Sequence, residues 1–150
     1  MSKVANQLQA LGAKIHADSQ ASGEYGADQA IDGNTDTIWH TPWEGIAPEF
    51  PHELVVELDN PINLSGIKCL PRQDGNPNGW IKDFTVFTSA DGQNWAAAVQ
   101  GAFPQDAQWH TVKFAISAKA RYLKLVANSS FDLSKPYASL AELDILPVGK

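Results

Sequence analysis

Six consecutive residues, Asp32-Gly33-Asn34-Thr35-Asp36-Thr37, bring together oxygen-bearing side chains at very short spacing. Four side-chain oxygen donors and a glycine fall within this run, and Thr35 supplies a fifth donor. Hard cations such as calcium take about six to eight oxygen ligands, some of them backbone carbonyls, and Gly33 would let the chain fold around an ion. The spacing therefore indicates a candidate calcium site.

The run imitates an EF-hand only in part. Asp32, Asn34 and Asp36 match the first three ligand positions, but Thr37 stands at the glycine position and Trp43 at the position of the bidentate glutamate. A distant carboxylate would have to complete the shell. Glu142 is a candidate, because it lies in a predicted strand between Ala141 and Leu143. The alternative is a simple turn, in which Asp36 or Thr37 caps a neighbouring element.

Two loops are richer in polar and aromatic residues than connectors need to be, namely 22–50 and 72–80. Binding residues commonly lie on loops that a rigid scaffold holds in place. We therefore expect function to lie in these two loops.

The scaffold that must position these loops is predicted from apolar–polar alternation. A period of two, typical of half-buried strands, runs through 54–58, 84–88, 112–116, 122–125 and 141–145. Turn signals separate these segments, including Asn60-Pro61, Asp91-Gly92 and the stretch 74–79. We predict an all-β, antiparallel β-sandwich, with a jelly roll as the preferred topology because closed double sheets protect strand edges.

Length and composition fit one domain, which we place at 13–148, with 1–12 as a lead-in or linker. The net charge of −6 and the scattered Lys and Arg residues argue against nucleic acid as a partner.

Cys69 is the sole cysteine and lies in an apolar run, so we expect a small buried hydrophobe. No signal pattern occurs at the N-terminus; we expect a secreted or periplasmic protein whose signal has been removed.

Three sequence blocks, in order, resemble the discoidin-type, coagulation factor V/VIII C-type superfamily. They are Ala30 to Thr41 (AIDGNTDTIWHT), Leu70 to Ile81 (LPRQDGNPNGWI), and Ala120 to Val126 (ARYLKLV) followed by Ala141-Glu142-Leu143. More narrowly, the chain is similar to family-32 carbohydrate-binding modules, a group that includes the N-terminal domain of galactose oxidase. The resemblance implies a galactose-binding-domain-like β-sandwich.

A structural calcium ion is implied by the same resemblance. Its ligands would be the side chains of Asp32, Asn34, Thr37 and Glu142, with backbone carbonyls of Gln29, Thr37 and Ala141. Glu142 would then supply the distant carboxylate, and the ion would fasten a long loop to the last strand.

The resemblance also implies a sugar site. In galactose-binding relatives, residues equivalent to His40, Arg72 and Asn78 hold the sugar hydroxyls. Further candidates are Glu24 as an acceptor, Trp43 as a wall of the pocket, and Phe131 or Tyr137 as a stacking platform. The structural alternatives are that His40 only satisfies a buried backbone group and that Arg72 only pairs with Asp74 or Asp83.

We therefore expect a non-catalytic module that binds galactose, N-acetylgalactosamine or galacturonate, acting as a monomer and in some settings attached to a glycan-active enzyme. No G-x-S-x-G or H-E-x-x-H motif and no phosphate-binding loop occurs in the sequence. The alternative is a discoidin-type domain that binds a protein or a membrane, although these loops are acidic and contain tryptophan.

Overall fold

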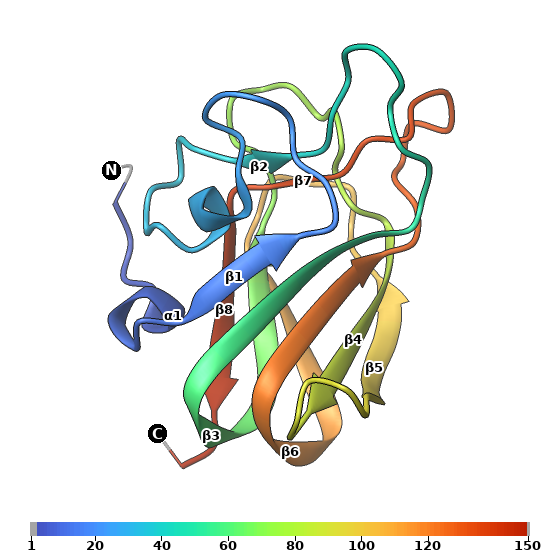
Figure 1. Ribbon diagram of the computed structural model, residues 1–150. Helices are drawn as coiled ribbons and strands as arrows, with labels where there is room; N and C mark the ends of the chain where they lie inside the picture. The colour runs from blue at the N-terminus through green and yellow to red at the C-terminus, as the bar shows by residue number, and fades with distance from the viewer. Residues whose placement is uncertain (1–2, 150) are drawn as a thin grey trace.

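The computed structural model describes residues 3–149 and consists mainly of antiparallel β-strands (Figure 1). The elements in chain order are α1 (Gln7–Ala10), β1 (Lys14–Ala17), the 3-10 turn η1 (Ala27–Ala30), β2 (Trp39–His40), β3 (His52–Leu70), β4 (Asp83–Ser89), β5 (Ala96–Ala102), β6 (His110–Ala127), β7 (Ser139–Leu140) and β8 (Glu142–Pro147). The predicted all-β, antiparallel class is confirmed.

Two long strands, β3 and β6, form the frame of the sandwich. They pair antiparallel from His52 opposite Ala127 to Cys69 opposite His110, with register shifts after Glu57 and Leu64. Their ribbons bend at the bottom of Figure 1, so each strand contributes to both layers. β1 pairs with the first half of β3, and β4 and β5 extend the sheet beyond the second half of β6. β8 pairs with the second half of β3.

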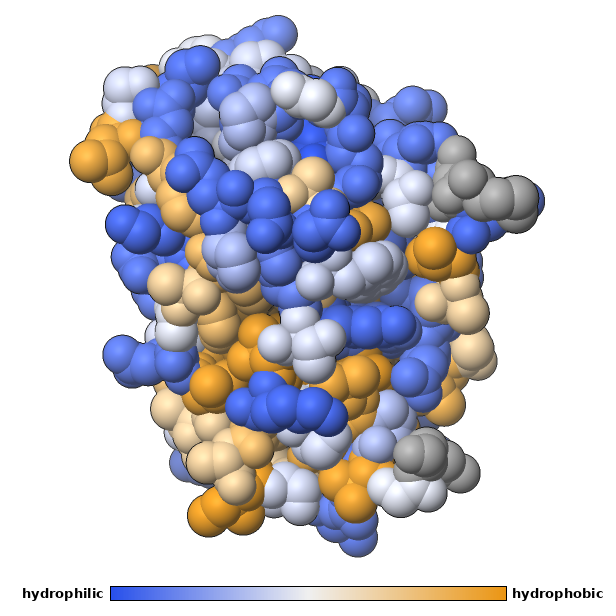
Figure 2. Space-filling view, turned by 180° about the vertical axis from the view of Figure 1, so that it is seen from behind, coloured by the Kyte–Doolittle hydropathy of each residue, from blue (hydrophilic) through white to orange (hydrophobic). Residues whose placement is uncertain are grey.

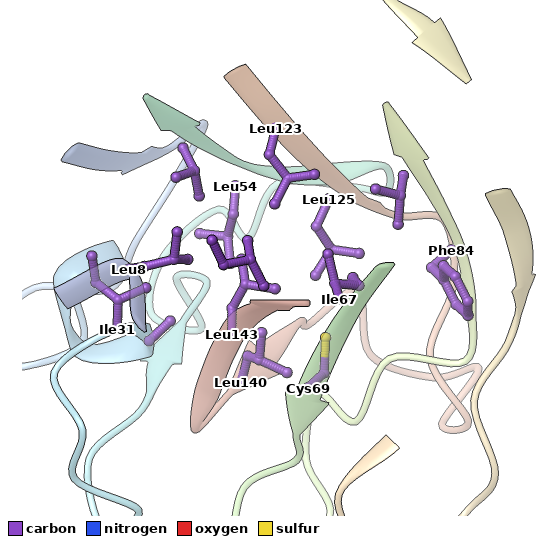
Figure 3. Packing of buried hydrophobic residues seen from close by; sticks show 14 of the residues in the cluster. Leu8, Ile31, Leu54, Ile67, Cys69, Phe84, Leu123, Leu125, Leu140 and Leu143 are labelled. Carbon is purple, nitrogen blue, oxygen red and sulfur yellow. The ribbon is translucent and has the colours of Figure 1, made fainter. Parts of the chain in front are cut away.

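The core lies between these two layers and is built from alternate residues of each strand (Figure 3). Leu54, Val56 and Leu58 of β3 are buried, as the alternation predicted. The second half of β3 adds Ile67 and Cys69 to the same cluster. Cys69 is therefore the buried hydrophobe that was expected, and burial raises the pKa of its thiol far above the ordinary value.

The two segments predicted as separate strands, 112–116 and 122–125, belong to the single strand β6. No glycine or proline punctuates the residues between them, so nothing ends the strand and it bends instead. Phe114 enters the core, whereas Ile116 is 83% exposed near the bend. The alternation of buried and exposed residues therefore ends at Phe114 and not, as the sequence predicted, at Ile116.

The first residues of the described chain pack onto the sandwich. Leu8, on α1, is fully buried within the core cluster. The backbone N–H groups of Gln7 and Leu8 donate to Asp144 Oδ1 at 3.0 and 3.1 Å. This contact explains why β8 is buried on both faces, Asp144 included, rather than on one.

The loops 18–38, 41–51, 71–80 and 128–138 gather at the top of Figure 1, around the short β2–β7 pair. Seen from behind, this end of the molecule is covered mainly by hydrophilic residues, and apolar residues gather on the lower half (Figure 2). Among residues 3–149, no helix has the length and apolar character needed to cross a membrane.

Candidate functional site

A hollow of about 310 Å³ opens among the loops at this end. It is lined by Tyr25, His40, Trp43, Arg72, Asn76, Asn78, Lys135 and Tyr137. These residues come from four segments that are distant in sequence but converge around β2 and β7. The structure therefore brings together five predicted site residues, namely His40, Arg72, Asn78, Trp43 and Tyr137.

His40 forms the floor of the hollow and is 2% exposed. Its Nδ1 lies 2.6 Å from the carbonyl oxygen of Thr41. Burial lowers the pKa of His40; the hydrogen bond to Thr41 opposes this effect, and the positive charge of Arg72 adds to it. The ring is thus neutral at pH 7, and because a carbonyl only accepts, the proton belongs on Nδ1. Nε2 is left as a hydrogen-bond acceptor.

Aromatic rings surround His40. Trp43 stands edge-on to it at a centroid distance of 4.8 Å, and Tyr137 lies tilted at 5.5 Å. Tyr25 packs against the edge of Trp43 at 5.0 Å. Trp43 remains 38% exposed, so an apolar surface is available beside the polar floor. Such a combination of rings and a few fixed polar groups suits a small polyhydroxylated ligand.

Arg72 forms another wall and is held by Asp74. The Arg72 Nε donates to both Asp74 carboxylate oxygens at 2.9 and 3.0 Å, and Nη2 donates to Oδ2 at 2.9 Å. These bonds hold the pKa of Asp74 below its usual range. Nη1 takes no part in these bonds. The guanidinium is therefore oriented along one edge and keeps donors for a ligand.

The loop that carries Arg72 and Asn78 is stiffened by its own side chains. The Asn76 N–H donates to Asp74 Oδ1 at 3.0 Å, and the Asn78 N–H donates to Asn76 Oδ1 at 2.9 Å. The Ser139 hydroxyl donates to the Asn78 carbonyl at 2.7 Å. Gly79 follows with a φ of +81°, and a Cβ there would lie 2.8 Å from the Ser139 nitrogen. The loop consequently approaches β7 as closely as only glycine permits.

Glu24 lies in a neighbouring hollow of about 290 Å³, which shares Tyr25 and Arg72 with the first. Asp36, Thr37 and Asp74 also line this second hollow. Phe131 lines neither. The structure thus places Tyr137, rather than Phe131, beside His40, and it separates Glu24 from the floor of the first hollow.

The candidate calcium ligands also converge. Glu142 is fully buried; its Oε1 accepts from Asn6 Nδ2 at 2.9 Å and from the Gly33 N–H at 3.2 Å. Thr37 Oγ1 donates to Asp32 Oδ2 and, at 3.1 Å, to the Asn34 carbonyl. Gln29 belongs to η1, and Ala141 directly precedes Glu142. Residues from the 29–37 loop and from the start of β8 therefore meet at one place.

An orphaned oxygen provides the test of whether these residues suit a cation. Glu142 Oε2 is buried and has no hydrogen-bond partner in residues 3–149. Burial, together with the nearby Asp32, raises the pKa of Glu142 to about 8, against the opposing effect of the hydrogen bonds from Asn6 and Gly33. A buried carboxylate facing a second carboxylate is costly unless a cation joins them.

The donor set indicates which kind of cation would suit. Residues 3–149 contain no group of three or more His, Cys, Asp or Glu side chains arranged for a metal. The candidate set instead combines two carboxylates, Asp32 and Glu142, with amide, hydroxyl and carbonyl oxygens. All-oxygen sets of this type are typical of calcium, whereas zinc sites are built mainly on His and Cys.

Comparison with known proteins places most of the sandwich in one family. Residues 14–143 match the F5/8 type C domain family. This chain belongs to that family. Galactose oxidase of Gibberella zeae is 38% identical over 133 residues, which cover 87% of this chain and 19% of the enzyme. The chain thus spans about a fifth of the length of that relative.

Solved structures give the same answer at the level of the fold. A family-32 carbohydrate-binding module of Clostridium perfringens, in complex with GalNAc-β-1,3-galactose, is 32% identical with a TM-score of 0.84, covering 95% of this chain and 99% of that one. The family-32 module of NanJ from C. perfringens, in complex with galactose, is 30% identical with a TM-score of 0.78, covering 89% and 92%. The predicted resemblance and jelly-roll sandwich are confirmed.

In this F5/8 type C domain, His40 and Arg72 each make the structural contact that was considered as an alternative to sugar binding, and both still line the hollow. His40 does satisfy a backbone carbonyl, and Arg72 does pair with Asp74, yet each uses only one edge of its side chain. Sequence reasoning missed Tyr25, Asn76 and Lys135 as lining residues. Tyr25 and Asn76 lie in the two loops singled out as unusually polar and aromatic, whereas Lys135 lies in the separate 128–138 loop. Alternation carries no signal for side chains in loops.

Proposed function

We propose that this F5/8 type C domain is a non-catalytic carbohydrate-binding module for a galactose-configured sugar. The observation that supports the proposal most directly is the convergence of His40, Arg72 and Asn78 on one hollow with an aromatic wall. The family membership and the sugar complexes of the two C. perfringens modules add to it.

The groups around the hollow suggest how a sugar would be held. His40 Nε2 would accept a hydrogen bond from one hydroxyl. Arg72 Nη1 and the free hydrogen of Nη2 would donate to two neighbouring sugar oxygens, a paired geometry that lysine cannot reproduce. Asn78 can donate and accept through its amide. Trp43 and Tyr137 would cover an apolar C–H face of the ring.

A site of this size and openness should bind weakly, with a Kd of roughly 10 µM to 1 mM. Modules of this strength act by raising the local concentration of an attached partner at a polysaccharide. We propose that role here, because the curated relatives that match are much longer chains.

The test is calorimetric titration with galactose and N-acetylgalactosamine. Arg72→Ala should abolish binding while the domain stays folded. Arg121→Ala provides the matched control, because Arg121 bonds to Glu57 and to the Leu58 carbonyl on the sheet. Undiminished affinity in Arg72→Ala would show that the sugar binds elsewhere. If the native chain bound neither sugar, the proposed function would be refuted.

We also propose that the Asp32–Glu142 cluster holds a structural calcium ion. The side chains of Asp32, Asn34, Thr37 and Glu142 would supply ligands, with carbonyls of Gln29, Thr37 and Ala141. When bound, the ion would neutralise the two facing carboxylates and fasten the 29–37 loop to β8. Extracellular calcium modules commonly have a Kd of about 10⁻⁴ to 10⁻³ M, which suits the secreted or periplasmic location that we expect.

A second candidate function, docking to a lipid surface, is favoured by one observation. Ile46 and Leu133 are 96% and 92% exposed, and their loops lie at the same end as the hollow (Figure 1). Exposed aliphatic side chains on loop tips suit insertion into a membrane. Co-sedimentation with phosphatidylserine vesicles, compared between the native chain and Ile46→Ser, tests it; no binding by the native chain would exclude this function.

A further inference from the structure

The charges around the His40 hollow are of one sign. Arg72 and Lys135 are the charged residues among those that line it, whereas the carboxylates of Glu24, Asp36 and Asp74 line the neighbouring hollow. His40 is neutral at pH 7 because burial lowers its pKa. The full chain carries a net charge of −6, so a cationic hollow is not a consequence of overall composition.

Lys135 carries the less compensated of the two positive charges. The ion pairs found within residues 3–149 are Arg72–Asp74, His110–Asp106 and Arg121–Glu57, so no carboxylate there lies within 4.0 Å of the Lys135 ammonium. Arg72, by contrast, is bound along one edge by Asp74.

Two acidic side chains lie near Lys135 without forming an ion pair with it. Asp132 Oδ1 accepts from the Ser134 N–H at 2.9 Å and from its hydroxyl at 2.6 Å. The hydrogen bonds from Ser134, and to a lesser degree the positive charge of Lys135, hold the pKa of Asp132 below its usual range. The other acidic neighbour, Glu49, lines an adjoining hollow together with Asp132 and Lys135 but forms no ion pair with the lysine. Lys135 therefore lies between two hollows and lines the His40 hollow together with its aromatic and polar groups.

A neutral sugar offers this second cation hydroxyl oxygens as acceptors but no opposite charge. A carboxylate or a sulfate ester on the sugar ring would supply that charge and form charge-assisted hydrogen bonds with an ammonium and with a guanidinium. We propose that the hollow selects a galactose-configured sugar bearing an anionic substituent, and that Lys135 is the residue that recognises this anion. The inference rests on the proposed function and specifies its ligand class.

The test compares neutral and anionic versions of one sugar. Calorimetry or NMR titration would use methyl galactoside, methyl galacturonoside, its neutral methyl ester, and galactose 6-sulfate. The native chain should bind one of the anionic sugars about two- to five-fold more tightly than the neutral ones, the size of an exposed ion pair. The preference should shrink as salt is raised. Galacturonoside and 6-sulfate separate the two possible sources of the anion.

Lys135→Gln should remove the preference, so that the variant binds the anionic and neutral sugars with the same Kd. Lys119→Gln is the matched control, because Lys119 is exposed on β6 opposite Asn63, at the bend far from the loops. Equal binding of neutral and anionic sugars by the native chain would overturn the inference and leave the proposed function intact. A preference that persists in Lys135→Gln would also overturn it. No binding of any of the four sugars would overturn both.

Discussion

Replacing Asp74 by asparagine tests whether the hollow depends on a side chain that lies outside it. Asp74 accepts three hydrogen bonds from Arg72 and does not line the His40 hollow. Asparagine keeps an oxygen for the Asn76 N–H, so the turn of the loop should survive. The charge that fixes the guanidinium would be lost.

The magnitude follows from the exposure of the pair. The Asp74 side chain is 57% exposed and that of Arg72 is 17% exposed, so the pair should contribute under about 1 kcal/mol to folding. Binding would then have to order the Arg72 side chain, which costs about 0.5–1.5 kcal/mol. We expect Asp74→Asn to weaken sugar binding by about 2- to 12-fold with little change in melting temperature.

The assay is calorimetric titration of galactose with the native chain, Asp74→Asn and Asp91→Asn. Asp91 is the matched control: it caps the turn between β4 and β5, where its Oδ1 accepts from the N–H groups of Gln93 and Asn94. An unchanged Kd in Asp74→Asn would refute the argument that Arg72 needs this partner. Equal weakening in Asp91→Asn would show a general effect of lost charge.

Four other predictions follow from the same geometry. Chelation of calcium should lower the melting temperature by roughly 5–10 °C, from about 2.7 kcal/mol of mass-action stabilisation at 100 times Kd; Glu142→Gln should make the melting curve insensitive to the chelator, and an unchanged native curve would exclude the ion. Galactose affinity should be constant at neutral pH and fall as the pH drops through the lowered pKa of His40, because protonation removes the acceptor on its ring; the unfolded chain takes up this proton at a higher pH than the folded chain, so folding stability should fall in the same direction. Gly79→Ala should reduce galactose binding more than tenfold by titration, because its φ is +81° and the new Cβ would meet the Ser139 nitrogen at 2.8 Å; retained affinity would show that the loop can yield. Leu125→Ala should lower the free energy of unfolding by about 2–5 kcal/mol in urea denaturation, since Leu125 is 2% exposed in the core; a loss below 1 kcal/mol would mean that the core closes over the gap.

The fold could be predicted because strand alternation is a local signal. Val56 and Val86 each lie in a run of period two, and both are buried where that period places them. The signal failed where tertiary contacts decide. Asp144 would face solvent in a half-buried strand, but α1 covers that face and donates two N–H groups to Asp144 Oδ1. A four-residue helix offers no periodicity from which such a contact could be foreseen.

The site was predictable to the extent that its residues lie in the resembling blocks. His40, Arg72 and Asn78 lie there, and they line one hollow. Tyr25 and Lys135 lie outside the quoted blocks, and their positions depend on loop conformations that no short-range pattern fixes. The choice between Phe131 and Tyr137 was open for the same reason, and only the fold of the 128–138 loop places Tyr137 beside His40.

The short β2–β7 pair connects the two candidate sites through the backbone. His40 pairs with Ser139 and Trp39 pairs with Leu140. Thr37 lies two residues before β2, and Glu142 lies two residues after β7, so an ion would anchor the outer ends of the same two strands that present the floor of the hollow. Calcium binding and sugar binding would then be thermodynamically linked. Calcium should tighten sugar binding by some factor, and by reciprocity the sugar should tighten calcium binding by the same factor.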